Sequence, residues 1–486
     1  MDEALINTSA PKHRTYAIRW WLLILASFIA GNQGGTWLVY GVIAEAVKPL
    51  YGWTDATIAL ISQWGPICYL VAAWPTSYLL DVHGLRTTAI VSSGLLFAGG
   101  VCRCVHHATD STGTLLVHAG QILNGLVGPV AMSIAPPLSA QWFAPDERVL
   151  ATAIASTANY GGSAVFFVLG AYCVPPGPAD QVRDNLWKLM VGMCAFSALL
   201  FVCCLLSFPA RPPSAPSVSA AVERAPPLRG LAVIARTVPF WLLTVSYGVV
   251  SGVFQSWGSL LGPILQGVNA SFLPADVAEA QAGWLGMYGA LAGIVGGILL
   301  GLYADRWIAA AGRRKQLLLA SCALGALGFG AFSLACTKGS VFEHATDGAR
   351  VAVIYGASIF GSLWANAATP LYYELAVEAT YPVAEGLTTA LLTLVQNSFC
   401  FLFLIVPQAL PELGTAWMSW AVVVACGVGM LVLVPLAEPR RRLAVDTRSD
   451  TRAATAERAA ASGAAAASGA AAAMAQAPEG LPRSAW

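Results

Sequence analysis

Charged residues are scarce in this chain of 486 residues. Asp, Glu, Lys and Arg together make up 10 % of it, whereas ordinary soluble domains contain about 25 %. Hydrophobic residues make up 57 %, and the mean hydropathy is +0.65. A soluble globule needs far more polar surface than this composition supplies. The composition therefore excludes an ordinary soluble domain and indicates a protein that is embedded in lipid.

The sequence also lacks the charge and cysteine patterns of two other classes of protein. Lys and Arg number 26 against 25 Asp and Glu, so the formal net charge is +1 and we expect no nucleic-acid partner. The 11 Cys residues contain no C-x-x-C pair and no zinc-ligand spacing, so we expect no metal site and no cofactor. Whether a disulfide forms among Cys102, Cys104, Cys173 and Cys336 is left open.

Long stretches with almost no charge run through the whole chain. A helix that crosses the hydrocarbon core needs about 20 mostly apolar residues, and continuous apolar runs favour helices over barrel strands. Twelve such runs are present, at approximately 20–44, 57–80, 85–105, 115–142, 150–174, 186–208, 240–266, 282–303, 317–336, 351–373, 387–410 and 416–436. The first run is too long for a signal-peptide core, so we interpret it as a retained helix.

The distribution of Lys and Arg predicts which side of the membrane is cytoplasmic. If both termini are cytoplasmic, the inner segments before the tail contain sixteen of these residues and the outer segments contain six. Cytoplasmic loops are enriched in Lys and Arg. We therefore predict cytoplasmic termini, and we place the sequon at Asn269 in an outer loop, where it is a candidate glycosylation site.

A segment rich in Pro, Ser and Ala divides the runs into two groups of six. It covers residues 207 to 230, and its composition disfavours both a helix and a packed core. The tail beyond residue 438 becomes rich in Ala and Gly, which is typical of disorder. We predict an N-terminal segment (1–18), a first bundle (19–209), a linker (210–236), a second bundle (237–438) and a disordered cytoplasmic tail (439–486).

The two halves contain related sequences at the inner end of their second run. The first is SYLLDVHGLRTT, residues 77 to 88, and the second is GLYADRWIAAAGRRK, residues 301 to 315. Each has an Asp at the helix end, followed by Gly and Arg before the next helix. Two matching six-helix halves are typical of a duplicated transporter scaffold.

The second copy resembles the GxxxDRxGRR loop motif of the major facilitator superfamily, apart from a four-residue insertion. Three longer stretches, at 64–70, 120–156 and 372–386, resemble the solute-carrier group of the feline leukaemia virus subgroup C receptor proteins, especially its disrupted-in-renal-carcinoma protein 2 branch. This resemblance implies an all-α membrane protein with the major facilitator fold, in which twelve transmembrane helices form two pseudo-symmetric six-helix bundles. It also implies transport by alternating access.

Charges near the inner helix ends are candidates for an inner gate. An Asp is poorly placed at a helix C-terminus unless something compensates, such as a neighbouring Arg or the N-terminus of a helix from the opposite bundle. We expect this gate contact at Asp305 ahead of Asp81, because the second copy matches the motif better. The other candidates are Arg86, Asp146, Arg148, Arg306, Arg313, Arg314, Glu378 and Glu385.

These charges also have simpler interpretations. The loop charges could be solvated residues that only determine topology. Acids are stabilised at helix N-termini, so Asp146, Glu147 and Glu385 could be helix caps, and Glu374 and Glu378 lie close to the same helix start. These alternatives stay open.

No Asp, Glu, Lys or Arg lies deep in any run, which argues against a strongly charged anionic substrate. Polar and aromatic residues remain, and these stack on flat rings, attract organic cations and orient a ligand by hydrogen bonds. The candidate substrate-binding residues are Gln33, Trp37, Trp64, Asn124, Asn159, Gln255, Trp257, Gln396 and Asn397. Each could instead anchor at the interface or bind a neighbouring helix. His118 is the candidate for proton coupling.

We therefore expect a transporter of a small organic metabolite rather than an enzyme, because the deep helices contain no converging acid, base or metal ligands. The branch resemblance implies a pyridoxine-like vitamin and the lysosomal membrane, with proton coupling left open. Choline or ethanolamine, and haem, are alternative substrates, and the plasma membrane is the alternative location. A receptor without transport is the alternative class. The expected partners are the substrate and the bilayer, and the chain is expected to be monomeric.

The choline-handling relatives provide a more specific expectation. The resemblance implies that Trp37, Asn159, Gln255 and Asn397 correspond to their central site. This chain departs from them at Gln255, where the relatives commonly have an aromatic residue, and at both Asn residues, which are shorter than the glutamines of the relatives.

Overall fold

A computed structural model describes residues 14–104, 111–217, 219, 227–261, 264–265, 275–304, 306, 313–337 and 347–445. Its regular elements are helices, and twelve of them have 18 residues or more. The first six are α1 (Ile18–Val42), α3 (Asp55–Tyr78), α4 (Gly84–Arg103), α5 (Ser111–Ser133), α7 (Arg148–Cys173) and α8 (Ala179–Ser207). The second six are α11 (Val238–Ser259), α13 (Ala275–Tyr303), α14 (Arg314–Cys336), α15 (Asp347–Ala367), α17 (Glu385–Ala409) and α18 (Ala416–Leu433).

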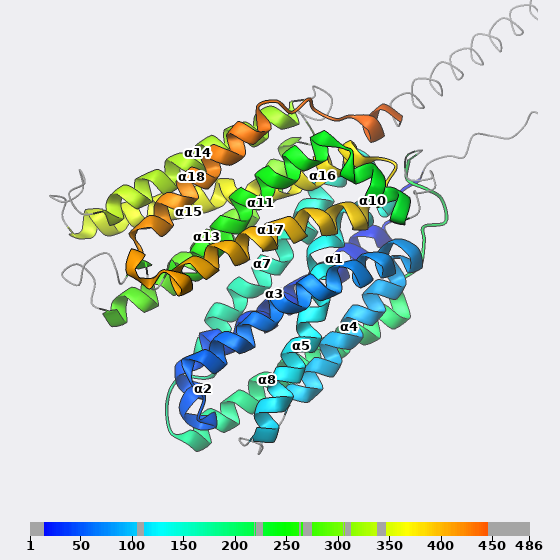
Figure 1. The fold of residues 1–486 in the computed structure, drawn as a ribbon. Helices are drawn as coiled ribbons and strands as arrows, with labels where there is room; N and C mark the ends of the chain where they lie inside the picture. The colour runs from blue at the N-terminus through cyan, green and yellow to red at the C-terminus, as the bar shows by residue number, and fades with distance from the viewer. Residues whose placement is uncertain are drawn as a thin grey trace, which may run out of the picture.

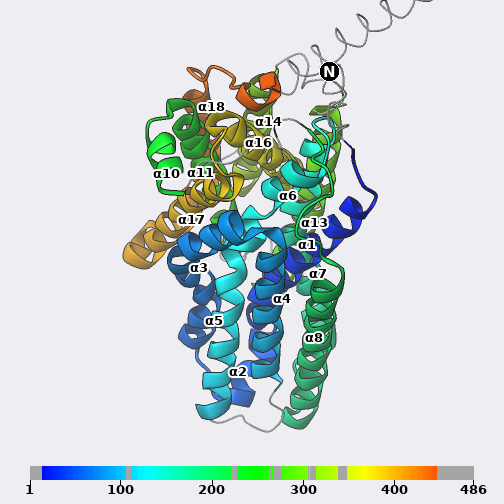
Figure 2. The same cartoon turned by 90° about the vertical axis from the view of Figure 1, so that its right-hand side faces the viewer.

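Short elements connect these helices. They are α2 (Ala44–Tyr51), the π-helical turn η1 (Leu79–His83), α6 (Ala135–Trp142), α10 (Pro227–Ala235), α16 (Thr369–Thr380) and η3 (Pro411–Leu413). The long helices form two bundles, which are drawn mainly in blue to cyan and in green to orange in Figure 1. Figure 2 shows the same two groups after a quarter turn. The bundles meet where α13, α16 and α17 contact α3, α5, α6 and α7.

The described helices agree with the twelve runs expected from the sequence. Ten helical stretches are long and apolar enough to cross a membrane. One of these stretches, Leu60–Arg103, covers most of α3 and all of α4, and α7 is an additional long helix outside the ten. The prediction of an all-α, twelve-helix membrane fold is therefore confirmed.

Two of the expected runs are broken in the structure, at equivalent places in the two bundles. The run 115–142 divides into α5 and α6, with Pro136 in the first turn of α6. The run 351–373 divides into α15 and α16, with Pro370 in the first turn of α16. Proline has no backbone N–H and its ring clashes with the preceding turn, so it starts a helix more readily than it continues one. Each break directs a short helix toward the junction between the bundles.

Within the first bundle, α1 and α7 approach each other closely at Gly31 and Gly162. A Cβ atom on Gly162 would overlap the backbone of Gly31. Small residues allow such contacts between membrane helices, because the backbones themselves can touch. The position of α7, which carries gate and central residues, therefore depends on the absence of a side chain at Gly162.

We expect Gly162→Ala to lower the stability of the purified protein by about 1–3 kcal/mol, because the two helices must separate to admit the methyl group. Thermal unfolding in detergent measures this as a lower midpoint. Gly192→Ala is the matched control, since nothing lies within 4 Å of a Cβ placed there. Equal midpoints for both variants would contradict the role of this contact.

All eleven cysteines are free in the structure. Residues 439–445 follow α18 and continue against the second bundle, with residues 441–445 helical. This part of the chain is therefore packed, whereas the sequence interpretation included it in a disordered tail. Residues 446–486 lie outside the described part of the chain.

Candidate functional site

Asp81 joins the two bundles at the end of the molecule that the sequence predicts to be cytoplasmic. It lies in η1, immediately after α3, and its carboxylate accepts hydrogen bonds from the backbone N–H groups of Gly386 at 3.1 Å and Leu387 at 2.8 Å. These groups belong to the first turn of α17 in the second bundle. A helix N-terminus carries partial positive charge and free N–H donors, so it is a favourable partner for a carboxylate. This contact is a clasp between the bundles.

Gly386 permits this clasp because it has no side chain. A Cβ atom at this position would collide with the carboxylate of Asp81. In the first copy of the repeat, which matched the motif less well, the Asp therefore contacts the N-terminus of a helix in the opposite bundle; its role in gating stays a prediction. Asp305 lies outside the described residues, so its role stays a prediction. Arg306 and Arg313 are exposed, and Arg314 is buried at the start of α14.

Glu374 forms a second junction between the bundles. It belongs to α16 and is 2 % exposed. Its Oε1 atom accepts a hydrogen bond from Thr152 Oγ1 at 2.8 Å, and Ser139 Oγ lies 3.5 Å away. Both hydroxyl groups belong to the first bundle, on α7 and α6. Glu374 was not among the gate residues predicted from the sequence, although the Thr369–Pro370 pair before it is a recognisable signal for the start of a short helix.

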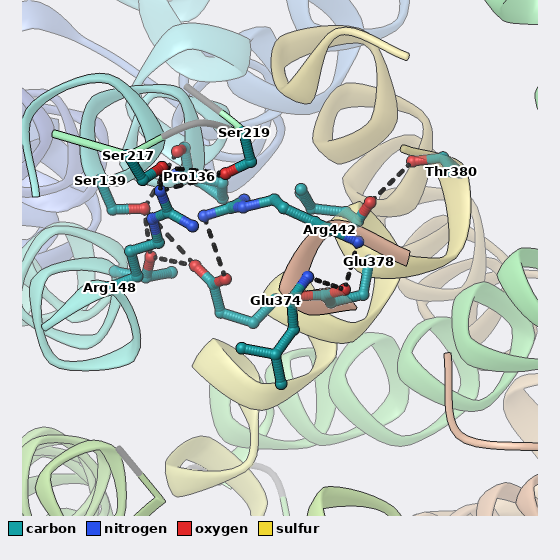
Figure 3. Close-up of polar contacts among 12 residues, drawn as sticks. Pro136, Ser139, Arg148, Ser217, Ser219, Glu374, Glu378, Thr380 and Arg442 are labelled. Atoms are coloured by element: carbon teal, nitrogen blue, oxygen red, sulfur yellow. Dashed lines mark hydrogen bonds and ion pairs between the residues drawn. The ribbon is translucent and has the colours of Figure 1, made fainter. Parts of the chain in front are cut away.

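Two arginines surround Glu374, as Figure 3 shows. Arg148, at the start of α7, donates to Ser217 Oγ at 2.6 Å and to Ser219 Oγ at 3.3 Å, so it binds the linker between the bundles. Arg442 Nη2 lies 3.9 Å from Glu374 Oε2. The backbone N–H groups of Arg442 and Leu443 donate to Glu378 Oε2 at 2.9 and 3.2 Å. Arg148 and Glu378, both expected in the gate, therefore lie in this network.

The other expected gate residues are placed differently. Arg86 donates to the carbonyl oxygens of Phe208 at 2.8 Å and Leu205 at 3.3 Å, so the contacts described for it join α4 to the end of α8 within the first bundle. Asp146 is exposed in the turn before α7. Glu385 is buried as the first residue of α17.

Amide side chains form pairs farther along the helices, in each bundle separately. In the first bundle, Asn159 Nδ2 donates to Gln33 Oε1 at 2.7 Å, and Asn124 Nδ2 donates to the Gln33 carbonyl at 3.2 Å. In the second bundle, Gln396 Nε2 donates to Gln255 Oε1 at 2.9 Å. These five expected substrate residues thus form two hydrogen-bonded clusters of amide side chains, one in each bundle.

Tyrosine and threonine side chains join the bundles near these amides. The Tyr69 hydroxyl of α3 is hydrogen-bonded to Thr393 of α17. Tyr247 donates to the hydroxyl of Tyr373 at 3.4 Å. Asn397 donates to the Thr393 carbonyl at 2.8 Å and contacts Met132 Sδ at 3.9 Å. Neither Thr393 nor Tyr373 was among the binding residues predicted from the sequence.

The three candidate tryptophans have different environments. Trp37 donates to the Ser62 carbonyl at 2.7 Å, and Trp64 donates to His118 Nδ1 at 2.8 Å, while both side chains are only partly buried. Trp257 is buried in the core of the second bundle, against Phe329 and Phe332, and donates to Ser419 at 3.3 Å. Its ring therefore belongs to the packing of this bundle.

The amide and aromatic residues described above have side chains that are suited to binding a small molecule. The amide, tyrosine and tryptophan side chains supply hydrogen bonds and aromatic faces, whereas the charged residues of the two junctions lie at the helix ends that the sequence predicts to be cytoplasmic. His118 can accept the Trp64 N–H only while its Nδ1 is unprotonated. Among the described residues, no group of three or more His, Cys, Asp and Glu side chains could hold a metal ion.

Known proteins resemble this chain over most of its length. Residues 22–403 match the family described as Major Facilitator Superfamily. The solute carrier family 49 member 4 homolog of Xenopus tropicalis is 31 % identical over 444 residues, which cover 89 % of this chain and 94 % of that protein. The choline/ethanolamine transporter FLVCR1 of Felis catus is 28 % identical over 406 residues, which cover 82 % of this chain and 68 % of that protein.

Solved structures agree with this fold. The transporter FucP in its outward conformation superposes with a TM-score of 0.66 at 12 % identity, covering 87 % of this chain and 100 % of that one. A bacterial homologue of the iron transporter ferroportin, in an outward-facing state, has a TM-score of 0.62 at 15 % identity, covering 87 % of this chain and 99 % of that one. At these identities the likeness concerns the fold alone.

Proposed function

The chain belongs to the major facilitator superfamily, and from this premise we propose that it carries a small organic metabolite across a membrane by alternating access. In this mechanism two bundles rock about a central site, so that the site opens to one side at a time. The proposal accounts for the two junctions between bundles, because both must break before the site can open toward the cytoplasm.

The observation that carries this proposal is the clasp between Asp81 and α17. It is built from a carboxylate of one bundle and two backbone N–H groups of the other, at 3.1 and 2.8 Å. Hydrogen bonds to a charged group contribute about 1.5–3 kcal/mol. A contact of this size holds the inner side closed, yet it is small enough to be broken and remade in every transport cycle.

For the substrate, we propose a small cationic or neutral molecule, with choline and ethanolamine as the first candidates. The central residues supply amides, tyrosine hydroxyls and the partly buried faces of Trp37 and Trp64. Aromatic faces attract quaternary ammonium groups, and amides hydrogen-bond a hydroxyl group without adding charge. The FLVCR1 relative is named for choline and ethanolamine. No relative described above is named for pyridoxine or haem, so pyridoxine serves as the comparison substrate.

Uptake into proteoliposomes tests this proposal. Radiolabelled choline, ethanolamine and pyridoxine are compared at acidic and neutral outer pH, which also tests proton coupling. Saturable uptake of choline or ethanolamine is the expected result. Saturable uptake of pyridoxine alone would overturn the assignment of choline and ethanolamine as substrates. If none of the three compounds showed saturable uptake, all three would be excluded as substrates. Immunolocalisation would test the lysosomal membrane against the plasma membrane.

Trp37→Ala should raise the KM for choline about tenfold. Removal of the indole deletes an aromatic face, and a partly desolvated cation over such a face gains about 1–2 kcal/mol. Trp187→Ala is the matched control, because Trp187 is exposed on α8. A similar KM for Trp37→Ala, Trp187→Ala and the parent protein would exclude Trp37 from the substrate site.

A further inference from the structure

Arg442 is buried although it lies beyond the last membrane helix. It is 1 % exposed and is among the largest fully buried side chains of the described residues. Arginine is almost never fully buried unless it is paired, because its charge loses solvation. The neighbouring Arg441 is exposed, so burial at position 442 is specific to one side chain of the Arg440–Arg442 run.

The segment that carries Arg442 is attached to the second bundle. The Lys315 ammonium donates to the Val434 carbonyl at 2.6 Å, and the Lys315 backbone N–H donates to Glu438 Oε2 at 3.2 Å. Glu378 of α16 then accepts the backbone N–H groups of Arg442 and Leu443 at 2.9 and 3.2 Å. These contacts hold the segment in place without the Arg442 side chain. The guanidinium group is therefore not needed to attach the segment to the second bundle.

The Arg442 guanidinium group points toward the junction between the bundles. Its Nη2 atom lies 3.9 Å from Glu374 Oε2, while the other oxygen of this carboxylate accepts the Thr152 hydroxyl of the first bundle at 2.8 Å. In Figure 3, Arg148 and Arg442 both point toward Glu374, from α7 and from the segment after α18. The carboxylate is thus shared between a hydroxyl group of one bundle and a cation attached to the other.

We propose that Arg442 is a positioning residue of the inner gate, so that the segment after α18 helps to set the balance between the outward-open and inward-open states. Its guanidinium group lies 3.9 Å from one oxygen of the buried Glu374 carboxylate and keeps the other oxygen directed at Thr152. A buried carboxylate without a cation takes up a proton or draws in water, and both changes weaken its contact with the first bundle. Removal of the guanidinium group therefore favours the open inner gate. This inference rests on the alternating-access part of the proposed function, and it is independent of the substrate.

Spin-label distances across the inner side test the role of Arg442 without any substrate. The labels are placed on Leu206→Cys and Leu228→Cys, at sites that are 82 % and 76 % exposed near the inner ends of α8 and α10, in a background without other reactive cysteines. Arg442→Gln should increase the ratio of long to short distances about tenfold. Arg441→Gln is the matched control and should leave this ratio as in the parent protein.

Two further variants keep the test decisive. Arg442→Lys retains the charge and should produce a smaller shift than Arg442→Gln, and it serves in its place if the latter does not fold. In a Glu374→Gln background, Arg442→Gln should add little, because the carboxylate on which Arg442 acts is gone. Parent-like distances in both Arg442 variants, or an undiminished effect in the Glu374→Gln background, would overturn the inference. A distance shift in a protein that transports none of the three substrates would leave the inference standing and refute only the substrate assignment.

Discussion

Asp81→Asn should reduce the initial rate of uptake about thirtyfold. The neutral amide loses the electrostatic attraction to the N-terminus of α17, and its oxygen is a weaker acceptor for the N–H groups of Gly386 and Leu387. A loss of about 2 kcal/mol from the closed inner gate lowers the ratio of outward-open to inward-open molecules about thirtyfold. Uptake in proteoliposomes, normalised to the amount of inserted protein, measures the effect.

Two other variants show whether the clasp itself is responsible. Gly386→Ala leaves the Asp81 charge in place, but its Cβ atom occupies the position of the carboxylate, so uptake should fall in the same direction. Asp180→Asn removes a carboxylate that is 95 % exposed at the start of α8, and it should leave uptake unchanged. Parent-like uptake in both Asp81→Asn and Gly386→Ala would mean that the contact is not a gate.

Gln255→Glu should shift selectivity toward cations by about thirtyfold. Gln255 Oε1 accepts a hydrogen bond from Gln396 Nε2 at 2.9 Å, and a carboxylate at position 255 can keep this contact. It adds one negative charge beside the proposed substrate. Two unit charges about 5 Å apart attract each other by about 3 kcal/mol at an effective dielectric constant of about 20, and partial screening reduces this value.

The quantity to measure for Gln255→Glu is the ratio of apparent affinities for choline and for pyridoxine, obtained by mutual competition. The ratio should rise in favour of choline, because pyridoxine is largely uncharged near neutral pH. Gln181→Glu adds the same charge at an exposed position on α8 and should leave the ratio unchanged. An unchanged ratio in Gln255→Glu would place Gln255 outside the substrate site.

The gate residues show how much of the inner contact could be predicted from the resemblance to the loop motif. The loop motif indicated an Asp at the end of the second helix in each half, and in the described part of the chain Asp81 lies there and contacts the N-terminus of α17. The motif favoured the second copy, yet the degraded first copy supplies the clasp that the structure describes. Similarity to a motif concerns the residues of the loop alone, whereas the contact of Asp81 also depends on the residue that faces it in the other bundle. This residue is Gly386, which has no side chain to block the carboxylate.

Glu374 and Arg442 show what the sequence did not reveal. Glu374 lies 222 positions after Thr152 and 68 before Arg442, and these separations place the residues on α7, on α16 and beyond α18. The two proline breaks were visible in the sequence, but hydropathy treats each broken helix as one continuous run. Only the direction of α16 after its break brings Glu374 to the junction with the first bundle.

Composition and pattern alone determined that this chain lies in a membrane, that it has twelve long helices in two related halves, and that its deep residues are uncharged. These properties depend on local sequence, because each helix satisfies its own backbone hydrogen bonds in lipid. The tertiary structure decided which charges meet and which aromatic rings are buried in a core. Such contacts join distant segments, and their geometry follows from the packing of whole helices rather than from the order of residues in any one of them.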